Sequence, residues 1–526
     1  MSLFKKLFKD IFPQQQKWRD EQISVEQPIG RDLLENKKIL LGIFGSTTDF
    51  YYQPIKLVNK SGFLFYFKSM VDEKEVNERI LKNFTQINQS EKVIISDDDL
   101  EKVREEYFAG LPFQFVKDYK SLSGKLLNGY VALLIDRFDR ALVIAVNSIE
   151  YRAITEPSTQ TIIRGPKDSF TESIDTNISL IRRKIKNPKL QFEEHVVGID
   201  SRTKISMAYM EGVVNQGILM EARSRIQSIN LYAIFDSGNI EEVITDKNYT
   251  PFPLIFNTER PDVAAGGILE GRIAIIVEGS PFVLIIPAVL TDFFQSAEDY
   301  YQPYLMSSFI RIIRYMAFMV SLLLPGLYVS IISFHHELLP TDLLISIQAQ
   351  REGVPFPAVF EIFLMEMTFE ILREAGIRMP RAVGQTVSIV GALVIGQAAV
   401  EAGLVSNALV IVVAFTAIAS FVSPIYNFSI STRLLRFVLI LFAAVMGLYG
   451  ILIFLIAMVA HLVSLRSFGV PYLAPVAPLI MEDQQDVFVR FPVWSNKTRP
   501  TFLKTEQNIK MNEIHKPGPP KKEGNS

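Results

Sequence analysis

Residues 437–463 read FVLILFAAVMGLYGILIFLIAMVAHLV, and this stretch contains no Lys, Arg, Asp or Glu. Two other stretches have the same character: residues 315–334 carry no charge, and residues 383–424 carry a single charge, at Glu401. A bilayer core about 30 Å thick needs roughly 20 apolar helical residues to span it. These stretches therefore predict a membrane domain in the second half of the chain. The four predicted spans cover about residues 312–334, 383–402, 405–424 and 436–463.

The first half of the chain has the mixed charged and apolar sequence of a soluble protein. Short runs rich in β-branched and aromatic residues alternate with amphipathic stretches, which favours small α/β units. The predicted strands are residues 62–67, 130–135, 140–146, 190–199, 203–209 and 229–235, and the predicted helices are residues 73–84, 168–187 and 215–226. We place the helix cap of 168–187 at Asp168.

The fold class that follows is α+β with a membrane part: two small α/β subdomains, then a polytopic α-helical transmembrane domain. We expect the subdomains over residues 37–150 and 151–271. Residues 272–306 contain two short apolar runs around Glu278 to Pro281, which favour a β-hairpin near the membrane over a transmembrane helix. The remaining predicted segments are an amphipathic, flexible N-terminal segment (1–36), the transmembrane domain (307–480) and a flexible C-terminal tail (481–526).

Composition removes several classes of function. The chain has 526 residues with 54 Lys and Arg against 56 Asp and Glu, so there is no basic field to hold nucleic acid. It has no cysteine and only five histidines, which excludes disulfides and thiolate metal sites. Neither a P-loop nor a Gly-x-Ser-x-Gly or His-Glu-x-x-His motif is present. We therefore expect no enzymatic activity, no metal and no cofactor.

A charged stripe runs along an otherwise apolar predicted helix. Residues 357–375 contain Glu366, Glu370 and Glu374 at helical spacing, and Arg373 lies beside them. A charge at membrane depth costs several kcal/mol unless it is paired or hydrated. This helix therefore lies in the membrane interface, or its stripe faces a protein interior or an ion route. The sequence leaves both alternatives open.

A second stripe combines small and polar residues within 383–400. Helical spacing places Gln385, Ser388, Ala392, Ile395 and Ala399 roughly along one face. Small residues allow close helix packing, and polar residues seek partners or water. The stripe is either a packing face within one bundle or the lining of a pore in an oligomer.

Long, dispersed motifs give the chain a resemblance to a known family. The most specific motifs are TERPD at residues 258–262, SIVGALVIGQ at residues 388–397 and SFGVPY at residues 467–472. Over almost all of residues 40–480 the chain resembles the A subunit of spore germination receptors, the membrane receptors of endospore-forming bacteria. The first 35 residues and the tail after residue 495 carry no such resemblance.

The resemblance implies a nutrient germinant receptor in the inner spore membrane. Four spans place both large ends of the chain on one side of the membrane, and we expect the large N-terminal domain on the cytoplasmic side. It implies a multispanning B subunit and a lipoprotein C subunit as partners, and a homo-oligomer that conducts monovalent cations when nutrients bind. Two alternatives remain: a non-conducting scaffold that relays nutrient binding by a partner subunit, and an accessory of the dipicolinate-release machinery.

Overall fold

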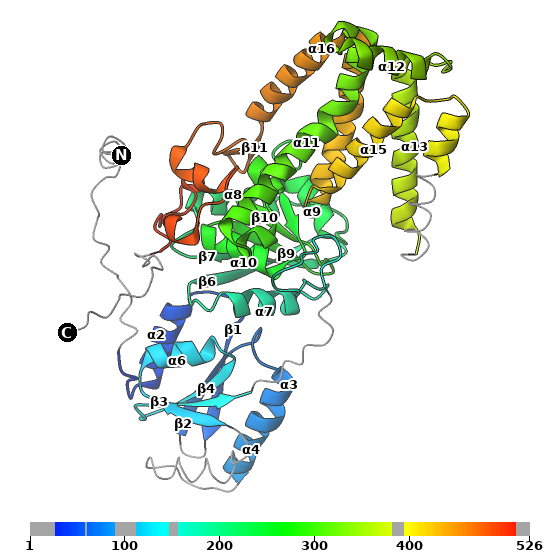
Figure 1. Cartoon of the computed structure of the whole chain (residues 1–526). Helices are drawn as coiled ribbons and strands as arrows, with labels where there is room; N and C mark the ends of the chain where they lie inside the picture. Colours follow the sequence, from blue (N-terminus) through cyan, green and yellow to red (C-terminus); the bar gives the residue numbers. More distant parts are fainter. Residues whose placement is uncertain (1–26, 58–59, 90–111, 147–155, 381–393, 512–526) are drawn as a thin grey trace, which may run out of the picture. The chain divides into compact units, whose positions relative to one another are not determined.

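The computed structural model describes residues 27–57, 60–89, 112–146, 156–380 and 394–511 (Figure 1). The chain divides into two compact units. One unit comprises Met1–Glu150 with Lys186–Lys189, and the other comprises Tyr151–Ile185 with Leu190–Ser526.

The first unit is a three-layer α/β subdomain. Its sheet is antiparallel, in the order β1-β2-β4-β5-β3. The strands are β1 (Phe50–Leu57), β2 (Lys60–Phe67), β3 (Phe113–Val116), β4 (Tyr130–Ile135) and β5 (Ala141–Ala145). The helices are α2 (Leu33–Phe44), α3 (Glu73–Glu75), the π-helical η1 (Val76–Leu81), α4 (Lys82–Gln89) and α6 (Tyr119–Leu126).

Successive residues of the strands pack into hydrophobic cores on opposite faces of this sheet. On β4, Leu133 packs with η1 and α4, whereas the next residue, Leu134, packs with α2 and α6. The subdomain begins earlier than predicted, because Asp32 caps α2 and Ile29 and Leu33 are buried in this core. Residues 1–26, the main part of the predicted amphipathic segment, lie outside the described residues.

The second unit contains another antiparallel sheet, in the order β6-β7-β9-β10-β8. The strands are β6 (Leu190–Val197), β7 (Thr203–Met210), β8 (Phe256–Thr258), β9 (Ile273–Val277) and β10 (Val283–Ile286). Helices α7 (Ile174–Lys184) and α10 (Pro261–Glu270) cover one face, and α8 (Gln216–Gln227) and α9 (Ser237–Ile244) cover the other.

Three predictions about this subdomain are corrected. The hairpin between residues 272 and 288 exists, as β9 and β10, but it lies inside the second sheet and is not a separate segment near the membrane. Residues 229–235 are not a strand; the carbonyls of Leu231 and Tyr232 bind the turn after β6 instead. The cap of α7 is Ser173 and not Asp168.

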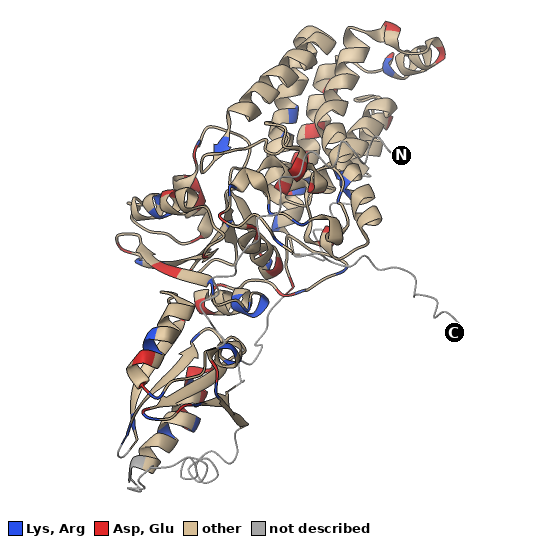
Figure 2. Ribbon diagram, turned by 90° about the vertical axis from the view of Figure 1, so that its left-hand side faces the viewer, with Lys and Arg blue, Asp and Glu red and all other residues tan. Residues whose placement is uncertain are grey.

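The helical part of the second unit follows directly. Two short 3-10 turns, η2 (Leu290–Phe294) and η3 (Ala297–Tyr300), lead into α11 (Tyr304–Ser333). The next helices are α12 (Thr341–Arg351), α13 (Ala358–Arg378), α15 (Asn407–Phe421) and α16 (Tyr426–Ser464). Figure 2 shows long stretches of these helices without charge, whereas charged residues are spread over the α/β part of the same unit. The charges of the helices include the acidic and basic residues of α13.

Among the described residues, two helices are long and apolar enough to cross a membrane, α11 and α16. The predicted span 405–424 corresponds to α15, whose 15 residues fall short of the roughly 20 that a span needs. The predicted span 383–402 lies partly outside the described residues, and residues 394–401 of it are helical.

Helix α16 is not one straight span of residues 436–463. Gly447 has φ 60° and ψ −140°, which breaks the helical ladder. The rings of Phe442 and Phe454 lie 5.9 Å apart, whereas 12 residues of straight helix separate two positions by about 18 Å. The chain therefore reverses at Gly447, and Figure 1 shows the two limbs meeting at this bend.

The C-terminal region differs from the predicted flexible tail. Residues 481–511 form short turns, η5 (Met481–Asp486), η6 (Val493–Ser495) and η7 (Thr501–Leu503), against the second subdomain. Leu503 is buried, and Asn215 donates to the carbonyls of Leu503 and Lys504. Tertiary contacts of this kind carry no local periodicity, so composition alone suggested disorder.

Candidate functional site

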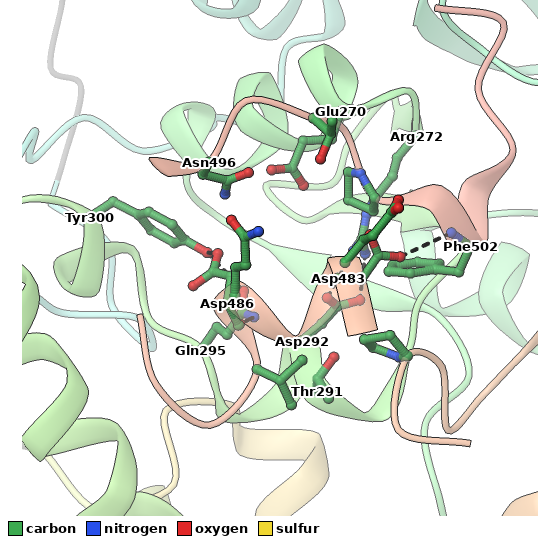
Figure 3. Close-up of a pocket in the computed structure, with 16 residues that line it drawn as sticks. Glu270, Arg272, Thr291, Asp292, Gln295, Tyr300, Asp483, Asp486, Asn496 and Phe502 are labelled. Atoms are coloured by element: carbon green, nitrogen blue, oxygen red, sulfur yellow. Dashed lines mark hydrogen bonds and ion pairs between the residues drawn. The ribbon is translucent and has the colours of Figure 1, made fainter. Parts of the chain in front are cut away.

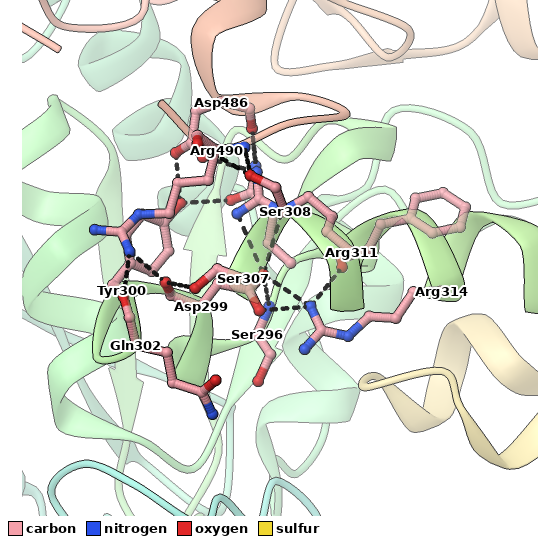
Figure 4. Close-up of polar contacts among 12 residues, drawn as sticks. Ser296, Asp299, Tyr300, Gln302, Ser307, Ser308, Arg311, Arg314, Asp486 and Arg490 are labelled. Atoms are coloured by element: carbon pink, nitrogen blue, oxygen red, sulfur yellow. Dashed lines mark hydrogen bonds and ion pairs between the residues drawn. The ribbon is translucent and has the colours of Figure 1, made fainter. Parts of the chain in front are cut away.

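The root of α11 is held by a buried cluster of charges (Figure 4). Arg311 and Arg314 are three residues apart on α11 and share one face. Asp299, in η3, accepts hydrogen bonds from both: 3.2 Å from Arg311 Nε and 2.7–2.8 Å from Arg314 Nη1. Arg311 is 0% and Asp299 is 2% exposed, so each charge depends on the other for its stability.

The C-terminal segment completes this cluster. Asp486 accepts from Arg311 Nη1 at 2.7 Å and from the Tyr300 hydroxyl at 2.6 Å. Arg490 donates to the Asp299 carbonyl at 2.6 Å, and its own amide binds Ser308 on α11 at 3.0 Å. Chain segments nearly 200 residues apart therefore fix the first turns of α11 to the α/β subdomain. We call Asp299, Arg311, Arg314, Asp486 and Arg490 the root cluster.

A small acidic pocket of about 60 Å³ lies beside the root cluster (Figure 3). Several of its carboxylates already have donors. Arg272 pairs with Asp292, and Lys510 pairs with Glu270. The amides of Thr501 and Phe502 donate to Asp483. This pocket therefore acts as a contact between the C-terminal segment and the subdomain, with room for a few water molecules.

A larger cavity of about 560 Å³ lies where the second sheet meets the ends of α15 and α16. Its wall includes Arg260 just before α10, Gly266 of α10, Arg314 of the root cluster, and Phe421 at the end of α15. Ligand sites in proteins commonly have volumes of about 300–1,000 Å³. The size and the mixture of polar and apolar walls make this cavity a candidate binding site.

Part of the predicted charged stripe on α13 forms ion pairs in the structure. Glu366 lies 3.1 Å from Arg436 of α16, with exposures of 1% and 0%. Glu370 pairs with Arg433 at 2.6 Å and with Arg373 at 3.3 Å. The structure therefore places this part of the stripe against other helices of the same chain.

Glu374 does not join that network. It pairs with Arg378 on its own helix, and both side chains are mostly exposed. Arg373 instead stacks on Phe369 and Phe421 and donates to Ser420 of α15 at 2.7 Å. The stripe thus divides into a buried part and a surface part, which helical spacing alone does not distinguish.

The predicted pore-lining stripe can be followed at two positions only. Gln385, Ser388 and Ala392 lie outside the described residues. Ile395 is exposed, whereas Ala399 is buried against α11, α13 and α15 in the cluster around Val329, Ile362 and Leu409. Whether the stripe lines a pore stays a prediction.

Sequence reasoning missed Asp299, Asp486, Arg433 and Arg436 as members of charge clusters. One signal was available: Arg311 with Arg314, and Arg433 with Arg436, each lie three residues apart at the edge of an apolar run. Arginines with this spacing share a helix face and need acidic partners when that face is buried. The identity of the partners depends on tertiary structure.

The fold and the root cluster together define a class of protein: a membrane-associated protein in which an α/β subdomain is clamped to the first long apolar helix. The chain belongs to the GerA family, described as Bacillus/Clostridium GerA spore germination protein, which matches residues 38–502.

Individual relatives agree with this assignment. The chain is 43% identical over 510 residues to spore germination protein KA of Bacillus subtilis (strain 168), covering 96% of this chain and 92% of that protein. It is 40% identical over 465 residues to spore germination protein A1 of the same organism, covering 88% and 91%.

One solved structure is also similar. The crystal structure of the N-terminal domain of the A subunit of the Bacillus megaterium spore germinant receptor GerK3 is 32% identical, with a TM-score of 0.41. The match covers 50% of this chain and 98% of that one.

Proposed function

We propose that this chain is the A subunit of a nutrient germinant receptor in the inner spore membrane, and that several copies form a nutrient-gated channel for monovalent cations. Membership of the spore germination family supports the role in germination. The partners in this proposal are a multispanning B subunit and a lipoprotein C subunit, and the N-terminal domain faces the cytoplasm.

In this proposal the α/β subdomain is coupled to the membrane helices, and the root cluster is the observation that supports the coupling. Asp299 belongs to the segment that leaves the second sheet, and it binds two arginines on the first turns of α11. Because these groups are buried, separating them leaves charges without partners at a cost of several kcal/mol. A displacement of the subdomain is therefore passed to α11, which is how a soluble domain can gate a membrane helix.

The course of the helices supports a polytopic arrangement. Asp299 holds the start of α11 at the subdomain, and Tyr328, near the other end of α11, binds Ser406 at the start of α15 at 3.1 Å. α15 ends beside the subdomain, and α16 leaves it, reverses at Gly447 and returns. Helices that follow this course place the α/β part before α11 and the segment after α16 on the same side of the membrane.

The alternative function is a non-conducting scaffold, and one observation favours it. Between α13 and α16, arginines already pair with the carboxylates of Glu366 and Glu370. They therefore hold no free negative charge to attract a cation. In the channel proposal, conduction uses a passage between copies, lined by the part of the stripe from Gln385 to Ile395, since Ala399 packs within one copy.

Potassium flux from liposomes tests the two functions against each other. The purified full chain is reconstituted alone and with its partner subunits, and its oligomeric state is measured by chromatography with light scattering. The channel proposal predicts flux, and Ala392→Phe should abolish it while the oligomer remains. Ala349→Phe, at an exposed alanine of α12, is the matched control and should conduct normally. An oligomer that never conducts would establish the scaffold.

A further inference from the structure

The cavity of about 560 Å³ has no role in the coupling described above, although it lies at the level where the apolar helices begin. Helix α10 forms one wall, and the turn between α15 and α16, including Phe421 and Pro424, forms another. Gly266 of α10 is exposed, and a Cβ placed there meets nothing within 4 Å. The cavity is therefore open and accessible on this side.

A buried cation with unused donors contributes to the cavity wall. Arg260 is 1% exposed and precedes the first turn of α10. Its Nη2 donates to Asp262 at 2.7 Å and to the Pro166 carbonyl at 2.8 Å. Its Nε and Nη1 have no hydrogen-bond partner among the described residues. Both nitrogens are covered by protein atoms in this side-chain position. A buried donor without a partner costs about 1–3 kcal/mol, and more when it is charged, so a rotation of the guanidinium toward a ligand oxygen in the cavity would be favoured.

Three acidic groups of the wall have cationic partners, and a fourth, Glu298, accepts a hydrogen bond from the neutral side-chain amide of Gln302. Asp262 pairs with Arg260 and accepts from the Tyr301 hydroxyl at 2.6 Å. Glu270 pairs with Lys510, and Asp292 pairs with Arg272. The unused hydrogen-bonding capacity therefore belongs to a cation, and an anionic oxygen group suits it better than an ammonium group.

An exposed apolar stripe leads along α15 into the cavity. Ile411, Phe415, Ile418 and Phe421 follow one another at helical spacing, and all four side chains are exposed. Phe421, at the end of this stripe, is 67% exposed and lines the cavity. An elongated apolar group can thus lie on α15 while its polar end enters the cavity.

We propose that this cavity binds the phosphate headgroup of an anionic phospholipid, with Arg260 as its main donor and one acyl chain lying on the exposed face of α15. The lipid would occupy the space between the subdomain and the turn that joins α15 to α16. Its presence would set the spacing of these two parts, independently of whether the chain conducts ions.

Lipid retention by the purified full chain tests this proposal. After delipidation in neutral detergent, the chain is mixed with phosphatidylglycerol or phosphatidylcholine, and bound lipid is counted by native mass spectrometry. We expect one phosphatidylglycerol per chain, bound at least tenfold more tightly than phosphatidylcholine. Inorganic phosphate and glycerol 1-phosphate are added in separate samples, and the unfolding temperature is measured.

Two variants separate binding from folding. Arg260→Gln removes the positive charge, and Gly266→Leu fills the cavity from a helix position where a side chain has space and where leucine favours helix more than glycine does. Each should weaken phosphatidylglycerol binding at least tenfold. Gly42→Leu, at an exposed position of α2 with equally open space, is the matched control and should bind normally.

The opposite results are equally clear. Equal retention of both lipids, or unchanged retention by a folded Gly266→Leu protein, would overturn the proposal. Thermal protection by inorganic phosphate without lipid retention would overturn the lipid assignment and give the cavity to a soluble anion.

Discussion

At the scale of single residues, Asp299 determines whether two guanidinium groups can remain buried at the root of α11. Its two carboxylate oxygens serve Arg311 and Arg314, and its carbonyl serves Arg490 and Ser307. Removing one partner of a buried ion pair is costly because the remaining charge stays in a low-dielectric environment.

We therefore predict that Asp299→Asn lowers the free energy of unfolding in detergent by about 3–5 kcal/mol. Asp200→Asn, which removes a carboxylate from an exposed turn, is the control and should change it by less than about 0.5 kcal/mol. Thermal and denaturant unfolding of the full chain measure both. Equal stability of the two variants would show that the root cluster contributes nothing to the fold.

Glu241 of α9 gives a prediction about pH. Burial raises the pKa of this carboxyl from 4.5 to about 7, and Asp236 adds to the shift. The folded state therefore binds a proton that the unfolded state releases, so the stability from Glu241 is complete below pH 4.5 and is lost as the pH rises through 7.

Replacement of Glu241 by Gln should remove this loss. Between pH 5 and pH 8, the wild type should lose on the order of 1–3 kcal/mol more stability than Glu241→Gln. Glu242→Gln changes an exposed neighbour and should behave as the wild type. Unfolding measured at both pH values decides the matter, and parallel pH profiles for all three proteins would contradict the shifted pKa.

The sequence predicted residue pairs well only where the partners lie on one helix. Spacing placed Glu366 and Glu370 on a common face, and the structure buries Glu366 and half-buries Glu370. It also grouped Glu374 with them, although that side chain points outward. Asp299 and Asp486 were not foreseen, because no local pattern links residues 187 positions apart to the same arginine.

At the scale of elements, short-period patterns were reliable and sequence-distant contacts were not. The predicted strands at 62–67, 130–135, 140–146, 190–199 and 203–209 are present, because alternating or continuous apolar runs suit a buried sheet. The apolar run at 229–235 failed because its carbonyls bind a turn instead of a neighbouring strand. The C-terminal turns were also missed, because they depend on contacts with residues far away in the sequence.

The reversal of α16 at Gly447 is the largest departure from the predicted spans. Hydropathy gives no sign of it, since the apolar run continues through the bend. A glycine is required there: its φ is positive, and a Cβ would lie 2.7 Å from His335 Cε1.

Cysteine cross-linking tests this reversal in a chain that has no cysteine of its own. We predict that a flexible bismaleimide joins Phe442→Cys to Phe454→Cys, because the two rings are 5.9 Å apart. Ile430→Cys with Phe442→Cys has the same spacing within the first limb of α16 and should not be joined by the same short linker. Failure of the first pair, or equal cross-linking of both, would contradict the reversal.

At the scale of the whole molecule, three features belong together: a charged α/β part, a group of helices with long uncharged stretches, and a buried junction between them. The apolar runs and the family motifs made the overall division predictable from the sequence. The junction was not predictable, because it depends on a C-terminal segment whose composition suggested disorder. The coupling proposed here rests on that junction.

The most direct test of this account is potassium release from liposomes that contain the full chain with its B and C partner subunits, recorded before and after nutrients are added. The account predicts little release before addition and a rise in release afterwards, with no rise when this chain is omitted. Liposomes that retain their potassium with every nutrient tested, although the complex is assembled, would contradict it.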